Sequence, residues 1–138
     1  MDSELKDGPK KILVVDDDDD DLLLDAVSQM LFRLGYHVIA ANSGDKGLDL
    51  FLKRKCDIVL TDFDMPGLDG ISLASHVKEK SPDTVVILMT GHDRESIMDL
   101  VSDSPVDLTL FKPFDLWTLV QTLQQRQPQR AQKQMSCC

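Results

Sequence analysis

Five polar side chains of this chain stand directly after apolar runs, with types that could act together chemically. They are Asp16, Asp17, Asp62, Thr90 and Lys112. Three carboxylates held close together repel one another, and the repulsion raises their pKa values. A hard divalent cation relieves that cost, and Mg²⁺ prefers oxygen ligands in near-octahedral geometry. If these residues meet in space, we expect Asp16, Asp17 and Asp62 to form a magnesium site.

The remaining groups of this set indicate phosphoryl chemistry beside the metal. The carboxylate of Asp62 can attack a phosphoryl group and form an acyl phosphate. The metal and the ammonium group of Lys112 would stabilise the charge on the phosphoryl oxygens. The hydroxyl of Thr90 can donate a hydrogen bond to the bound phosphoryl group. Because that bond exists only in the modified protein, Thr90 is a candidate switch residue.

The elements that must position these side chains follow from the pattern of apolar residues. Five short runs are continuously apolar, which is typical of strands buried on both faces. They cover residues 12–15, 38–41, 58–60, 85–89 and 108–111. Between them lie stretches of helical period, in which Leu34, Leu52 and Leu100 are among the residues expected on the apolar faces.

This alternation of strand and helix, repeated five times, predicts a three-layer α/β fold with a parallel sheet and right-handed crossovers. In an open parallel sheet, ligands bind outside the carboxyl ends of the strands. We therefore expect the five polar side chains to converge at one edge of the sheet.

Composition limits the other possibilities. The 138 residues suffice for one domain, with a loose leader expected over 1–9, the domain over 10–126 and a disordered tail over 127–138. The net charge of −9 argues against direct binding of nucleic acid. There is no apolar run long enough for a membrane span and no secretory signal at the N-terminus. Cys56, Cys137 and Cys138 are expected to be free thiols in a reducing compartment, so we expect a cytoplasmic protein.

Four segments, in order and at matching spacing, resemble the response-regulator receiver domain of two-component signalling. They are residues 11–18, 57–70, 86–91 and 111–114, and the resemblance covers about residues 10–126. It implies a flavodoxin-like doubly wound (βα)5 fold with strand order 2-1-3-4-5.

The resemblance also assigns roles residue by residue. Asp62 resembles the phosphoacceptor, Asp17 a direct Mg²⁺ ligand, and Asp16 a ligand acting mainly through water, with the backbone carbonyl of Asp64 as a further ligand. Thr90 and Lys112 keep the roles given above, and a cis peptide bond between Lys112 and Pro113 is typical of the family.

The implied activity is Mg²⁺-dependent phosphorylation from a phosphohistidine donor, which switches a surface that binds other proteins. The implied partners are a sensor histidine kinase or histidine phosphotransfer protein and a downstream protein target. The domain would be a monomer or a weak homodimer, and not an enzyme beyond its own phosphorylation and dephosphorylation.

Two other functions stay open at this point. Asp62 and Asp64 spell Asp-x-Asp, which resembles the nucleophile motif of haloacid-dehalogenase-type phosphatases, although that motif normally opens its domain. A pseudo-receiver that binds partners without phosphate is the other alternative, against which the intact set of five polar residues argues. An EF-hand does not fit, because the loop counted from Asp16 has Asp21 and Val27 where Gly and Glu are needed.

Three positions distinguish this chain within the resemblance. Thr109 stands where the family usually has an aromatic residue, so coupling between Thr90 and that position is expected to be weak or to use another residue. Asp64 and His92 lie two residues after the acceptor and after the threonine, respectively. Our hypothesis is that the Asp64 carboxylate alters the lifetime of the phosphoryl group through electrostatics and water access, while His92 could border the site.

Overall fold

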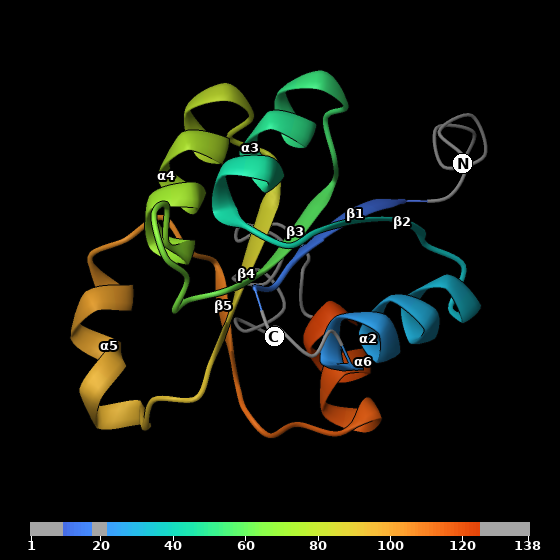
Figure 1. The fold of residues 1–138 in the computed structure, drawn as a ribbon. Helices are drawn as coiled ribbons and strands as arrows, with labels where there is room; N and C mark the ends of the chain where they lie inside the picture. The colour runs from blue at the N-terminus through green and yellow to red at the C-terminus, as the bar shows by residue number, and fades with distance from the viewer. Residues whose placement is uncertain (1–9, 18–21, 125–138) are drawn as a thin grey trace, which may run out of the picture.

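The computed structural model describes residues 10–17 and 22–124, so the leader and tail expected over 1–9 and 127–138 lie outside the described residues. Strands and helices alternate along the chain (Figure 1). The strands are β1 (Lys11–Val15), β2 (His37–Ala41), β3 (Ile58–Asp62), β4 (Val85–Thr90) and β5 (Leu108–Phe111). The helices are α2 (Leu22–Arg33), α3 (Gly44–Lys53), α4 (Gly70–Lys80), α5 (Arg94–Ser102) and α6 (Leu116–Gln124). Each apolar run of the sequence lies in a strand.

The strands form one sheet in the order β2-β1-β3-β4-β5, and every neighbouring pair is parallel. The predicted strand order is therefore confirmed. The direction in which successive strands are added reverses at β1: β2 lies on one side of β1, and the later strands follow on the other. The carboxyl ends of β1 and β3 thus flank the crevice where such sheets bind ligands.

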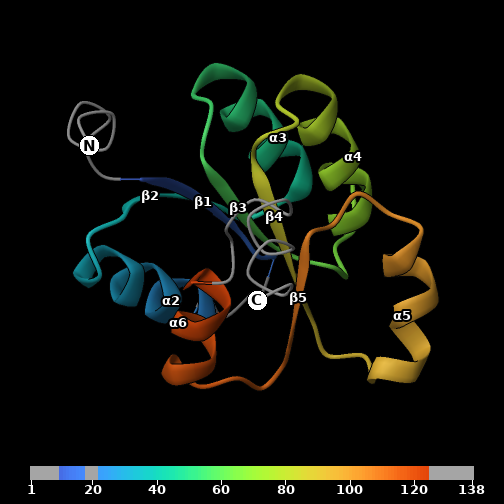
Figure 2. The same ribbon diagram turned by 180° about the vertical axis from the view of Figure 1, so that it is seen from behind.

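Helices cover both faces of the sheet, which explains the continuous apolar runs. Helices α2 and α6 pack on one face, and α3, α4 and α5 pack on the other (Figures 1 and 2). Alternate side chains of β1 point to opposite faces of the sheet: Val14 packs with the α2–α6 layer and Leu13 with the α3–α4 layer. Both side chains are fully buried.

Three leucines expected on apolar helix faces are exposed instead. Leu34 is 47% exposed, and Leu52 and Leu100 are each 54% exposed. Leu34 lies after α2 has ended at Arg33 and is therefore outside the helical period. Leu52 and Leu100 neighbour the buried Phe51 and Val101 in sequence, and a step of one residue turns a side chain about 100° around the helix. The helical period therefore predicted the direction of each apolar face, but Leu52 and Leu100 lie next to that face and not on it.

Cys56 lies buried just before β3 as a free thiol. Its thiol donates a hydrogen bond to the backbone carbonyl of Arg54 at 3.2 Å. Burial, with a smaller contribution from the charge of Asp57, raises the pKa of this thiol to about 11. Cys137 and Cys138 lie outside the described residues.

Among the described helices, none combines the length and apolar character that crossing a membrane requires.

Candidate functional site

Three aspartates meet at the carboxyl end of the sheet, where the sequence predicted a metal site. Asp16 and Asp17 follow β1, and Asp62 is the last residue of β3. Each offers one carboxylate oxygen, and these three oxygens all lie within 4.8 Å of one another. Asp16 and Asp62 are buried and Asp17 is half-buried. Carboxylates are rarely buried together without compensating charge, so the cluster calls for a positive group.

Lys112 supplies part of that positive charge from the loop after β5. Its Nζ lies 3.3 Å from Asp62 Oδ1 and 4.0 Å from Asp16 Oδ2. The Lys112 backbone N–H donates to the carbonyl of Thr90 at 2.7 Å, and the peptide bond to Pro113 is cis, as the resemblance implied. The ammonium group is therefore held on the rim of the aspartate cluster by the continuation of the sheet.

The electrostatics of Asp62 differ from those of an exposed aspartate. Burial raises the pKa of its carboxyl to about 6, against the usual 3.8. Lys112 opposes this rise, the negative charge of Asp16 adds to it, and the Phe63 backbone N–H donates to Oδ1 at 2.9 Å. Without further positive charge, Asp62 thus holds its proton more tightly than an ordinary aspartate.

Thr90 ends β4 at the same edge of the sheet. The register pairs Asp62 of β3 with Met89 of β4, and Thr90 with Phe111 of β5. Thr90 is fully buried, and its Oγ1 accepts a hydrogen bond from the backbone N–H of His92 at 3.0 Å. The structure therefore brings all five predicted side chains to one edge, with Thr90 between the strands that carry Asp62 and Lys112.

A side-chain pair beside the site joins the two loops that follow β3 and β4. His92 Nε2 lies 2.8 Å from Asp64 Oδ2. The His92 and Phe63 rings also pack in a T-shaped arrangement, with centroids 5.5 Å apart and an interplanar angle of 71°. Sequence analysis singled out Asp64 and His92 separately but did not predict that they bind each other.

Gly70 was missed by sequence reasoning, although its lack of a side chain shapes the site. It begins α4, which is capped by Asp69 through a hydrogen bond to the Ser72 N–H at 2.8 Å. A Cβ atom at Gly70 would lie 2.4 Å from the backbone oxygen of Asp62. Only glycine lets the start of α4 approach the backbone of Asp62 this closely.

Thr109 is half-buried in β5 and leaves the usual aromatic position without a ring. Phe111, two residues later on the same strand, does carry one. The Arg94 guanidinium lies 4.6 Å from the Phe111 ring centroid, a cation–π contact between α5 and β5.

The donor set fits a magnesium ion. Mg²⁺ takes hard oxygen ligands and is usually held by a few carboxylates together with water. Asp16, Asp17 and Asp62 offer three such oxygens close together, at an edge where Asp17 is only half-buried. Lys112 brings one positive charge to three carboxylates, so the cluster retains negative charge to attract a cation.

A family model described as the response regulator receiver domain matches residues 12–124. The chain belongs to this family. The receiver domain is the signal-accepting module of two-component systems, and the match covers β1 through α6, including the whole candidate site.

Solved structures of receiver domains have the same fold. The chemotaxis protein CheY4 of Vibrio cholerae superposes with a TM-score of 0.78 at 28% identity, covering 86% of this chain and 98% of that chain. The response regulator TrrA of Thermotoga maritima, solved in complex with Mg(2+)-BeF, superposes with a TM-score of 0.75 at 29% identity, covering 85% of this chain and 98% of that one. Receiver domains similar to this one therefore include one solved with magnesium.

Curated relatives are longer proteins. The transcriptional regulatory protein GlrR of Escherichia coli is 34% identical over 103 residues, which are 73% of this chain and 23% of that protein. The autoinducer 1 sensor kinase/phosphatase LuxN of Vibrio harveyi is 30% identical over 90 residues, 65% of this chain and 10% of that protein. The receiver domain thus spans about a quarter or less of the relatives named here.

Proposed function

We propose that this receiver domain accepts a phosphoryl group on Asp62 from a phosphohistidine donor and thereby switches a surface that binds a downstream protein. The observation that carries the proposal is the contact of Asp62 with Lys112 inside the aspartate cluster. A nucleophilic carboxylate, a cation beside it and an oxygen-rich ion site are the parts that phosphoryl transfer to an aspartate requires.

Transfer to Asp62 exchanges a phosphorus–nitrogen bond of the donor for a phosphorus–oxygen bond on the carboxylate. A carboxylate oxygen of Asp62 forms a bond to phosphorus while the bond between phosphorus and the donor imidazole nitrogen breaks. The imidazole leaves with that electron pair and takes up a proton. The product is an acyl phosphate on Asp62, and hydrolysis by water returns the carboxylate and releases inorganic phosphate.

Each residue of this chain has a separate task in that reaction. Asp62 attacks, and Lys112 stabilises the negative charge of the phosphoryl oxygens from 3.3 Å beside the nucleophile. Thr90 donates its hydroxyl to the bound phosphoryl group. Its Oγ1 accepts a hydrogen bond from the His92 N–H, so the loop after β4 follows any movement of Thr90.

Asp16, Asp17, Asp62 and the backbone carbonyl of Asp64 would hold Mg²⁺. When bound, the ion supplies charge neutralisation that lets the carboxylate approach an anionic phosphoryl group. The raised pKa of Asp62 shows why such charge matters: without it, the carboxylate is partly protonated near pH 6.

The partners proposed are a sensor histidine kinase or histidine phosphotransfer protein as donor and a protein as downstream target. Similarity to part of a sensor kinase and to parts of transcriptional regulators supports this class of pathway. We infer that the domain catalyses its own phosphorylation and dephosphorylation only, in the cytoplasm, as a monomer or weak homodimer.

Intact-mass analysis after incubation with acetyl phosphate and Mg²⁺ tests the proposal. The wild type should gain the mass of one phosphoryl group, and Asp62→Asn should gain none. Asp83→Asn, which removes an exposed carboxylate in the turn before β4, serves as the matched control and should be modified like the wild type. Modification that proceeds equally well in EDTA would contradict the mechanism, and an unmodified wild type would favour a phosphate-independent interaction module.

The same samples distinguish a phosphatase. A receiver domain is modified once and then loses the phosphoryl group slowly. A hydrolase of the Asp-x-Asp type would release many equivalents of phosphate from a phosphomonoester, and that release would depend on both Asp62 and Asp64. Phosphate release from para-nitrophenyl phosphate therefore separates the two functions.

A further inference from the structure

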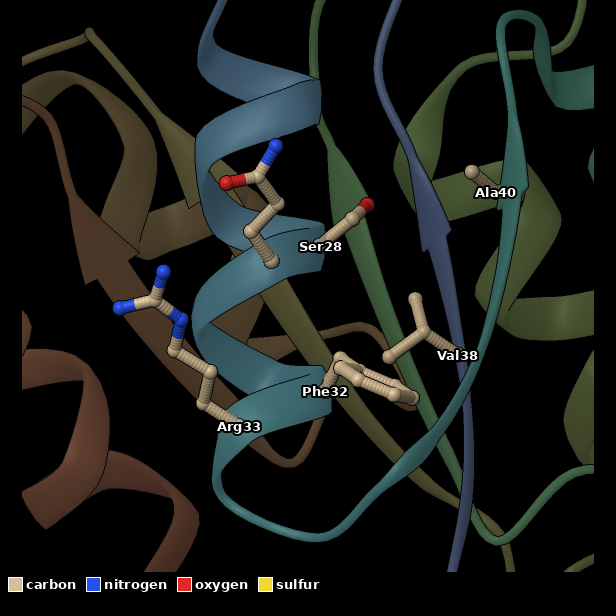
Figure 3. Close-up of a pocket in the computed structure, with 6 residues that line it drawn as sticks. Ser28, Phe32, Arg33, Val38 and Ala40 are labelled. Atoms are coloured by element: carbon tan, nitrogen blue, oxygen red, sulfur yellow. The ribbon is translucent and has the colours of Figure 1, made fainter.

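An open groove lies between α2 and the edge strand β2, and it shares no residue with the aspartate site (Figure 3). Its volume is about 500 Å³. The lining residues are Ser28, Gln29, Phe32 and Arg33 on the helix, with Val38 and Ala40 on the strand. Phe32 is 72% exposed, and its ring lies toward Val38 across the groove (Figure 3). A largely exposed aromatic ring in an apolar groove is the usual composition of a binding anchor.

The strand that forms one wall of this groove has an unpaired edge. Among the described strands, β2 pairs with β1 alone. Toward β1, the His37 N–H donates to the carbonyl of Lys10 at 2.8 Å, and the carbonyl of Ala41 accepts from the Asp16 N–H at 3.1 Å. Because the direction of backbone groups alternates along a strand, the N–H and C=O groups of Val38 and Ala40 face away from the sheet. Such an edge is a template for one more strand.

Positive charge lies around the start of β2, on both faces of the sheet. Arg33, the last residue of α2, lines the groove. Lys11 pairs in register with His37 at the start of β2, and by the alternation of strand side chains both point to the face opposite the groove. On that face, a guanidinium nitrogen of Arg54 lies 3.3 Å from His37 Nε2. Asp57 contacts the Lys11 backbone N–H at 2.8 Å and offsets part of this charge. Three cations around this end of the strand, Arg33 on the groove face and Lys11 and Arg54 on the opposite face, therefore favour a ligand with acidic side chains.

The charge of the whole chain decides between two possible occupants. A second copy would bring another net charge of −9, and two such copies repel each other wherever they meet. A short acidic segment of another protein avoids most of that repulsion and still complements the local cations. We therefore expect an extended ligand, which can pair with the edge backbone, fill the apolar groove and reach the cations.

We propose that the β2 edge and the adjoining groove form a docking surface for an extended segment of a partner protein. The segment carries an apolar side chain flanked by acidic residues. It adds to the sheet beside β2 through the backbone groups of Val38 and Ala40, and its apolar side chain packs against Phe32. Its acidic residues lie near Lys11, Arg33 and Arg54. This mode is strand addition with side-chain pockets, and it does not depend on phosphorylation of Asp62.

Selection from a random nine-residue peptide library displayed on phage, with the full chain as bait, tests this proposal. Enriched peptides should share an apolar residue flanked by Asp or Glu. In fluorescence anisotropy, Phe32→Ala should weaken their binding about tenfold or more, as loss of an anchor does. Ala40→Pro should do the same, because proline removes an outward N–H and is tolerated on an edge strand. Trp117→Ala, which removes a 69% exposed ring on α6, is the control and should bind normally.

Urea denaturation of each variant verifies that it is folded, and the exposure of Phe32 and Ala40 makes this the expected result. The proposal is overturned if no peptide is enriched, if enriched peptides lack acidic residues, or if Phe32→Ala and Ala40→Pro bind as the wild type does. It is also overturned if hydrogen exchange finds the Val38 and Ala40 amides protected in the dilute, peptide-free protein. Residues 1–9 or a second copy would then occupy the edge.

Discussion

Replacing Asp62 by Asn should stabilise the metal-free protein at neutral pH and leave its stability almost unchanged in acid. The physical reason is the raised pKa of the Asp62 carboxyl, about 6 in the folded protein against 3.8. The folded state binds this proton more tightly than the unfolded chain does. As the pH falls below about 4, the carboxyl becomes protonated in both states, so Asp62 no longer destabilises the folded protein. As pH rises through the interval from about 4 to 6, the folded state must hold a buried charge, and its stability falls.

The size of the effect follows from the same shift. A change from 3.8 to about 6 corresponds to about 3 kcal/mol, at about 1.4 kcal/mol for each pKa unit. The Asp62 side chain is 11% exposed, and solvent reduces the cost of its charge. We therefore expect Asp62→Asn to raise the free energy of unfolding by about 1–3 kcal/mol at neutral pH in EDTA.

Urea denaturation in EDTA at about pH 4, 5, 6 and 7 measures this difference. Asp83→Asn, at an exposed position, controls for the loss of one negative charge from an acidic protein. The difference between Asp62→Asn and wild type should be near zero at the acidic end and reach its plateau above about pH 6. A difference that is flat across this range, or that favours the wild type at neutral pH, would refute the reasoning.

Three further outcomes follow from the site. Mg²⁺ at a hundred times its Kd should stabilise the wild type by about 2.7 kcal/mol in thermal denaturation, and Asp17→Asn should lose most of this gain at the same concentration. Gly70→Ala should lower the free energy of unfolding by about 1–3 kcal/mol, because its Cβ would lie 2.4 Å from a backbone oxygen, whereas Gly91→Ala, with nothing within 4 Å, should cost much less in the same urea assay. His92→Ala releases the Asp64 carboxylate and should shorten the aspartyl-phosphate half-life roughly two- to fivefold, the equivalent of one exposed hydrogen bond. A wild-type half-life for Asp64→Asn would show that Asp64 has no part in hydrolysis. An equal effect of His92→Ala in the Asp64→Asn variant would show the same.

Much of the fold and the assembly of the site could be predicted from local patterns. Continuous apolar runs indicated strands buried on both faces, and alternation with helices indicated a parallel sheet. Asp16 and Lys112 each follow a strand and Asp62 ends one, so a parallel sheet alone was enough to bring them to one edge. The strand order required more than the pattern and came from the family resemblance.

Other features depend on packing that no local pattern encodes. The contact between Asp64 and His92 joins two loops 28 residues apart, and its formation depends on how both loops leave the sheet. The role of Gly70 depends on the angle at which α4 meets the end of β3. Leu52 and Leu100 show that helical period locates an apolar face without defining its width.

The buried thiol of Cys56 has a practical consequence for studying this protein. At 2% exposure and with a pKa of about 11, it presents almost no thiolate to an alkylating reagent while the domain is folded. Its neighbours belong to the centre of the fold, so only opening of that centre admits a reagent. The rate at which the Cys56 sulfur is alkylated therefore measures how often the native protein opens at its centre, and no engineered label is needed.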